Sequence, residues 1–116
     1  MSLDFRFQKA KKETKNLKDF RKVNFLERYF EDIGYDLDNC IPCQIDREDI
    51  KELIRRCEQV LKNNELAKEL LPTRNSYDIY YFQDVKEVLN FCKEKLLPEF
   101  NNLKDHEWIE FELVLS

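Results

Sequence analysis

The two ends of the chain alternate between hydrophobic and polar residues, whereas its middle repeats hydrophobic residues every three or four positions. Leu3, Phe5 and Phe7 alternate with polar neighbours, and residues 109–115 repeat that pattern. A period of two is typical of a strand with one apolar face. The alternation therefore predicts a strand at each end of the chain.

Three internal stretches have the hydrophobic spacing of amphipathic helices. Gly34 ends the first stretch, Asp46 precedes the second as an N-cap, and Pro98 ends the third or starts a further turn. We predict helices over residues 17–33, 47–62 and 79–97, a short helix over 65–71 that ends at Pro72, and a loop over 9–16.

Pairing of the two terminal strands is the simplest arrangement of these elements. An antiparallel pair places Arg6 opposite Glu110 or Glu112, which avoids contacts between like charges. Two strands alone are weak, so we expect the helices to cover them, with a third short strand at residues 41–45. The sequence thus predicts a single α+β domain over 1–116, in which three main helices cover a small antiparallel sheet.

The composition narrows the classes of function. No apolar run approaches the length of a membrane helix, and the N-terminus passes directly into charged residues, so we expect a cytoplasmic protein that contacts no membrane. The single glycine, Gly34, excludes glycine-rich phosphate loops and dinucleotide fingerprints. With one histidine and no evident nucleophile–base pair, we expect neither catalysis nor a cofactor.

Cys40 and Cys43 flank Ile41 and Pro42. This pair of cysteines has three interpretations: a redox dithiol, half of a metal site, or part of a structural strand. A redox thiol needs a helix N-terminus, whereas acidic residues surround this pair. A zinc site needs two further ligands at short spacing. We therefore expect no metal site, and reduced thiols at all four cysteines: Cys40, Cys43, Cys57 and Cys92.

Charge is unevenly distributed along the chain. Residues 1–22 hold eight Lys or Arg and three Asp or Glu, a balance of +5, whereas the rest holds twelve and twenty-one, a balance of −9. The basic segment is either an interaction surface or a solvated stretch beside an acidic body. Because the two fields oppose each other at short range, we expect no general binding of nucleic acid.

One group of polar and aromatic residues is a candidate ligand pocket. In it, basic side chains would bind a phosphate or carboxylate, and tyrosines would stack on a base or peptide. The competing interpretation is structural, with Asp78 capping a helix and the tyrosines in the core. The candidate residues are Arg21, Lys22, Asn24, Tyr77, Asp78, Tyr80 and Tyr81.

Five motifs occur in a fixed order along the chain: Leu3-Asp4, Phe20-Arg21-Lys22-Val23-Asn24, Asp38-Asn39-Cys40, Leu70-Leu71-Pro72-Thr73 and Ser76-Tyr77-Asp78-Ile79-Tyr80-Tyr81. Together they resemble an uncharacterised family of small bacterial and phage proteins. Phe20 replaces the usual Trp of that family, and Glu27 stands where a histidine is frequent. A Ser-Gly-Phe-Phe-Phe-Gly segment is absent between Pro72 and Tyr77, so the loop is shortened or a mobile segment is missing from the chain. The resemblance implies a fold and a phage-like setting, and no activity.

We therefore expect a small non-catalytic binding or protein-interaction module whose partner is another protein or a small anionic ligand. One alternative is a single-stranded nucleic-acid binder that uses the Lys-rich segment 9–22 with Tyr77, Tyr80 and Tyr81. The second alternative is a small enzyme that acts on a phosphorylated ligand.

Overall fold

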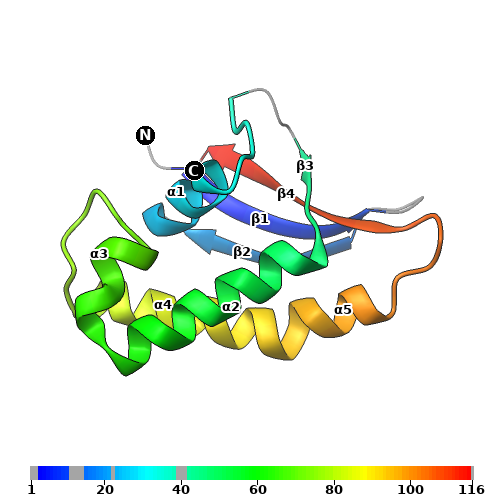
Figure 1. Ribbon diagram of the computed structural model, residues 1–116. Coiled ribbons are helices and arrows are strands. Elements are labelled where there is room, and N and C mark those ends of the chain that lie inside the picture. The colour runs from blue at the N-terminus through cyan, green and yellow to red at the C-terminus, as the bar shows by residue number, and fades with distance from the viewer. Residues whose placement is uncertain (1–2, 11–14, 22, 39–41, 116) are drawn as a thin grey trace.

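The computed structural model describes residues 3–10, 15–21, 23–38 and 42–115. Figure 1 shows one sheet with the longer helices gathered on one side of it. The elements follow in the order β1 (Leu3–Ala10), β2 (Lys15–Arg21), α1 (Asn24–Asp32), β3 (Cys43–Gln44), α2 (Arg47–Lys62), the 3-10 turn η1 (Asn64–Leu66), α3 (Ala67–Leu70), α4 (Ile79–Phe91), the π-helical turn η2 (Cys92–Leu96), α5 (Leu97–Asn101) and β4 (Trp108–Leu115).

The sheet is antiparallel, with strand order β2-β1-β4-β3. Its central pair joins the two terminal strands, so the predicted α+β fold is confirmed. Arg6 lies opposite Glu112, and its Nη1 is 3.5 Å from the Glu112 carboxylate, as strand pairing predicted. The third strand is also present: Cys43 and Gln44 pair with β4, whereas Ile41 lies outside the described residues.

Aromatic side chains form the core between the sheet and the helices. Phe30 of α1 stacks on Phe111 of β4 with ring centroids 4.4 Å apart, and Phe91 of α4 lies 5.4 Å from Phe7 of β1. Both contacts lie on the same face of the sheet, and α2 packs against α4. Removing these rings from water supplies the main driving force for the fold.

The prediction of one helix over residues 17–33, preceded by a loop, is wrong for the residues before Asn24. Residues 15–21 form β2 beside β1, and α1 begins only at Asn24. The register shifts by one residue between Phe7 and Gln8, which leaves Leu17 without a partner in β1. Such a bulge interrupts the alternation of hydrophobic and polar residues along a strand. The hydrophobic residues of β2 therefore have a spacing that is typical of a helix.

The third predicted helix does not stop at Pro98. Helix α4 continues through η2 into α5, where Pro98 is the second residue. Proline lacks the N–H that would donate to the carbonyl four residues back in a continuous helix. The π-helical turn before it widens the backbone where the proline ring would otherwise meet the carbonyl four residues back.

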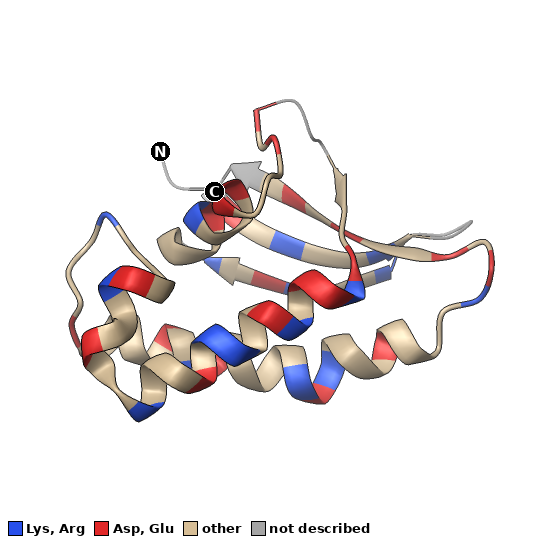
Figure 2. Ribbon diagram, viewed as in Figure 1, with Lys and Arg blue, Asp and Glu red and all other residues tan. Residues whose placement is uncertain are grey.

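Other local signals agree with the structure. Gly34 ends α1 with φ of +107°, a conformation that suits glycine. Helix α2 has the predicted bounds, although the Asp46 side chain makes no capping hydrogen bond. Acidic and basic residues alternate along α2 (Figure 2). Separately, the described part of the chain has no helix long and apolar enough to cross a membrane.

Candidate functional site

The loop between α3 and α4 is anchored to the start of α1. Oδ1 of Asn24 accepts hydrogen bonds from the Thr73 hydroxyl at 3.1 Å and from the Arg74 backbone N–H at 2.8 Å. Within the loop, the N–H of Asn75 donates to Thr73 Oγ1 at 3.2 Å. One amide side chain therefore holds two loop residues that follow it by about fifty positions in sequence.

Tyr77 and Tyr81 also hold this loop through their hydroxyl groups. The hydroxyl of Tyr81, a buried residue, donates to the Leu71 carbonyl at 2.8 Å, and burial raises the pKa of this tyrosine. The Tyr77 hydroxyl accepts from the Thr73 N–H at 3.2 Å, and its ring lies 5.1 Å from that of Tyr81. Both hydroxyls are thus engaged within the protein.

Asp78 caps helix α4, as one interpretation of the sequence expected. Its Oδ1 accepts a hydrogen bond from the Tyr81 N–H at 3.1 Å, which satisfies a free donor of the first turn. The next two residues point outward: Ile79 is 66% exposed and Tyr80 is 71% exposed. The first turn of α4 therefore presents two large apolar side chains to solvent.

A concave site of about 240 Å³, here called the α4 hollow, lies beside these exposed residues. Its walls come from the start of α1, the loop after Leu71 and the first turns of α4. Its lining includes the polar and aromatic residues Asn24, Thr73, Asp78, Tyr80, Tyr81 and Asp84.

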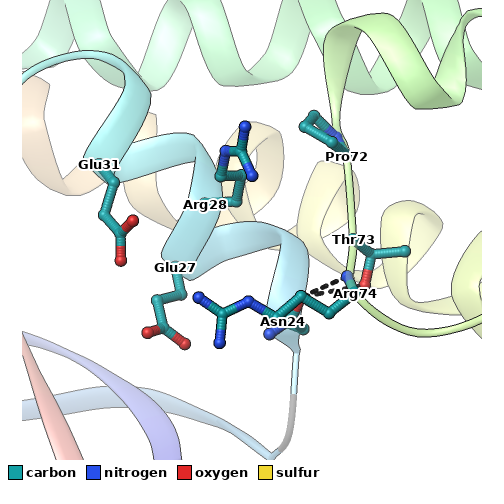
Figure 3. Close-up of a pocket in the computed structure, with 7 residues that line it drawn as sticks. All are labelled: Asn24, Glu27, Arg28, Glu31, Pro72, Thr73 and Arg74. Carbon is teal, nitrogen blue, oxygen red and sulfur yellow. Dashed lines mark hydrogen bonds between the residues drawn. The ribbon is translucent and has the colours of Figure 1, made fainter.

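A smaller cavity of about 40 Å³, which Asn24 also lines, lies between α1 and the loop (Figure 3). The Arg74 side chain points toward Glu27, while Arg28 points toward Pro72. Arg28 Nε also pairs with Asp32 at 3.0 Å. The charges of this cavity are mixed, and its volume suits little more than a water molecule.

The α4 hollow carries negative charge. Burial raises the pKa of Asp84, and the neighbouring Glu87 and Asp78 add to that rise. Within the described part of the chain, neither Asp78 nor Asp84 forms an ion pair. A cation placed between them would relieve both the repulsion and the cost of burial.

The structure brings together only part of the group expected from the sequence. Asn24, Asp78, Tyr80 and Tyr81 line the α4 hollow. Tyr77 supports the loop instead, and Arg21 lies exposed on β2 outside the lining. Lys22 lies outside the described residues.

Five residues that line this site are not among the candidates expected from the sequence: Phe25, Thr73, Asn75, Ser76 and Asp84. Asp84 follows Tyr80 by one helical turn, so the spacing of α4 could have identified it. Thr73 gave no such local signal, because its contact with Asn24 joins residues that are distant in sequence.

Two basic residues of the N-terminal segment are paired with acids. Arg6 Nε contacts Asp19 at 2.9 Å and holds the pKa of that carboxyl below its usual value. Lys9 Nζ lies 3.2 Å from Glu99 and 3.7 Å from Glu107. Lys15 and Lys18 are exposed on β2, whereas Lys11, Lys12 and Lys22 lie outside the described residues.

The expectation of four reduced cysteines is wrong at Cys43, which is disulfide-bonded. Acidic neighbours lower the reactivity of a thiol, but they do not decide whether two sulfurs lie within bonding distance. Cys57 and Cys92 are free and buried, and Cys40 lies outside the described residues. Burial raises the pKa of both free thiols, that of Cys92 to about 12.

In the described residues, no group of three or more His, Cys, Asp or Glu side chains is placed to hold a metal ion. Comparison of the chain with protein-family models, with curated proteins and with solved structures gives no match.

Proposed function

We propose that the chain is a small non-catalytic binding module of the cytoplasm, of the bacterial or phage type that its motifs resemble, and that it binds a partner protein at the α4 hollow. The observation that carries the proposal is the exposure of Tyr80, which lines that hollow, next to Ile79 in the chain, which is also exposed. Large apolar side chains beside a concave polar site are typical of interaction surfaces, and tyrosine is common among the residues that dominate binding energy.

The charge of the hollow indicates what the partner contributes. Asp78 and Asp84 line it, while Arg21, the cation expected for an anionic ligand, lies elsewhere on β2. A carboxylate or phosphate entering the hollow would meet two acids, whereas a lysine or arginine side chain would meet opposite charge. We therefore favour a basic side chain of a protein over the small anionic ligand.

The nucleic-acid alternative has less support from this site. Tyr80 is available for stacking, but the hydroxyls of Tyr77 and Tyr81 are bonded within the protein and Tyr81 is buried. Asp78 and Asp84 would also repel the phosphates of a strand that reached Tyr80.

An NMR titration tests the proposal with N-acetyl-arginine methylamide as the probe. We expect saturable shifts at millimolar concentration in the amides of residues 73–84, and weaker binding in Asp84→Asn. N-acetyl-glutamate methylamide is the matched control and should leave these amides unchanged. Equal effects of the two probes, or shifts confined to other regions, would refute the hollow as a cation site.

A further inference from the structure

Strand β2 has a free edge. The sheet order places β2 at one end, and among the described strands only β1 pairs with it. A free edge presents backbone N–H and C=O groups that can pair with an added strand. Five of the seven β2 residues are exposed to solvent.

A second hollow of about 280 Å³ lies beside this edge. Lys18 of β2 forms one wall, and Glu87, Asn90, Phe91 and Glu94 are among the residues of the other. The Phe20 and Phe91 rings, 5.4 Å apart, hold β2 alongside α4. Figure 1 shows β2 as the strand of the sheet that lies nearest to the helices beneath it.

The two hollows lie along one stripe of α4. Tyr80 and Asp84 line the first, and Glu87 and Phe91 line the second, at steps of four, three and four residues. Residues at this spacing share one helix face. Asn24, which closely follows β2 in the chain, lines the first hollow. Both hollows therefore border the same face of α4, the first beside the start of α1 and the second beside β2, and together they are called the groove here.

We propose that an extended segment of a partner protein pairs with the free edge of β2 and places a lysine or arginine side chain in the α4 hollow. The inference rests on the proposed function and deepens it. Backbone hydrogen bonds along the edge supply affinity, and alternate side chains enter the groove. The charges of the second hollow balance, with Lys18 and Lys95 against Glu87 and Glu94, and Phe91 offers apolar surface there. The segment therefore needs its basic residue only at the α4 hollow.

A second copy of this chain would meet like charges at this edge in two of the symmetric registers. Antiparallel pairing of two β2 strands centred on Lys18 places the two lysines opposite each other, and centring on Asp19 opposes two aspartates. Like charges directly opposite destabilise a pair of strands. Nucleic acid fits poorly as well, because Asp84, Glu87 and Glu94 line the groove.

The experiment uses a phage-displayed library of random peptides, selected against the whole chain. We expect enriched peptides that alternate β-forming residues and share one Lys or Arg, and that lose at least tenfold in affinity for Asp84→Arg. Lys62→Glu, at the far end of α2, is the matched control and should bind as the unchanged protein does.

Backbone N-methylation of a selected peptide then tests strand pairing. Methylation at every second residue should abolish binding, while methylation at the intervening residues should be tolerated, because alternate amides of an added strand face the sheet. Amides of β2 should also become protected from hydrogen exchange.

Peptides that need their Arg but show no alternation and no β2 protection would overturn the strand pairing and leave the proposed function standing. Failure to enrich any peptide would also overturn the strand pairing. So would protection of the β2 amides from hydrogen exchange that arises from self-association or from an oligonucleotide and not from a peptide.

Discussion

Oδ1 of Asn24 accepts a hydrogen bond from the backbone N–H of Arg74 at 2.8 Å, although fifty positions separate the two residues. The same oxygen accepts from the Thr73 hydroxyl at 3.1 Å. The wall of the α4 hollow that comes from the loop is thus positioned by a side chain at the start of α1. These two hydrogen bonds act together with those of Tyr77 and Tyr81 to hold the loop.

Asn24→Ala should destabilise the protein by about 1 kcal/mol, the usual net contribution of such hydrogen bonds. The substitution leaves the Arg74 N–H and the Thr73 hydroxyl without their acceptor. Urea unfolding measures the loss, and amide hydrogen exchange should show faster exchange at residues 73–75. Asn24→Asp keeps the accepting oxygen and should lose less. An equal loss in both variants would show that the hydrogen bonds are not what holds the loop.

Phe111→Ala should destabilise the protein by roughly 3–5 kcal/mol. Phe111 is 1% exposed, and its ring lies 4.4 Å from that of Phe30 and 5.4 Å from that of Phe5. The substitution leaves a cavity between the central strands and α1. Leu61→Ala, at a site 36% exposed, is the control and should cost far less. A loss below about 1 kcal/mol for Phe111→Ala would place this ring outside the core.

The alternating ends of the chain predicted the central pair of the sheet because each strand buries one face. The charges left two registers open, and in the structure Arg6 lies opposite Glu112. The sequence pattern does not predict strand β2, and the reason is physical. Its bulge at Leu17 removes the alternation, and the three-residue steps from Leu17 to Phe20 to Val23 continue into the true stripe of α1.

The candidate site was partly predictable for a similar reason. Asp78 as an N-cap is a local signal, and the structure confirms it. Arg21 was grouped with Asn24 because the two were expected on one helix, whereas Arg21 belongs to β2. The contact between Asn24 and Thr73 depends on the path of the chain after α2. No local sequence pattern predicts a contact between residues so far apart.

Cys57 and Cys92 should be unreactive toward Ellman's reagent in the folded protein. Both are fully buried, and burial raises the pKa of each thiol, so the nucleophilic thiolate is scarce at neutral pH. In guanidinium chloride both thiols should react within minutes, which controls for prior oxidation. Rapid modification of either thiol without denaturant would mean that this part of the core opens readily.

Glu52 should stabilise the protein less as pH falls through the acid range. Hydrogen bonds from Arg55 and then Arg56 lower the pKa of Glu52 to about 2, from a usual value of 4.5, with contacts of 2.5 and 2.8 Å. Because the folded pKa lies below the unfolded one, the stabilisation is fully present above about pH 4.5 and is lost as pH falls toward 2. Arg56 also donates to the Leu70 carbonyl at 3.3 Å and lies over the Tyr29 ring, so the ion pair helps to orient a link between α2, α3 and α1.

Urea unfolding of the protein and of Glu52→Gln, at several pH values between 6 and 2, measures this effect. The stability difference between the two should shrink as pH falls, because glutamine has no charge to lose. An NMR titration of the Glu52 carboxyl carbon should give a midpoint near 2, independent of overall stability. High salt should weaken the contribution of Arg55, which is exposed, more than that of Arg56, which is half-buried. A midpoint near 4.5, or a difference that stays constant with pH, would show that Arg55 and Arg56 do not hold this carboxylate in solution.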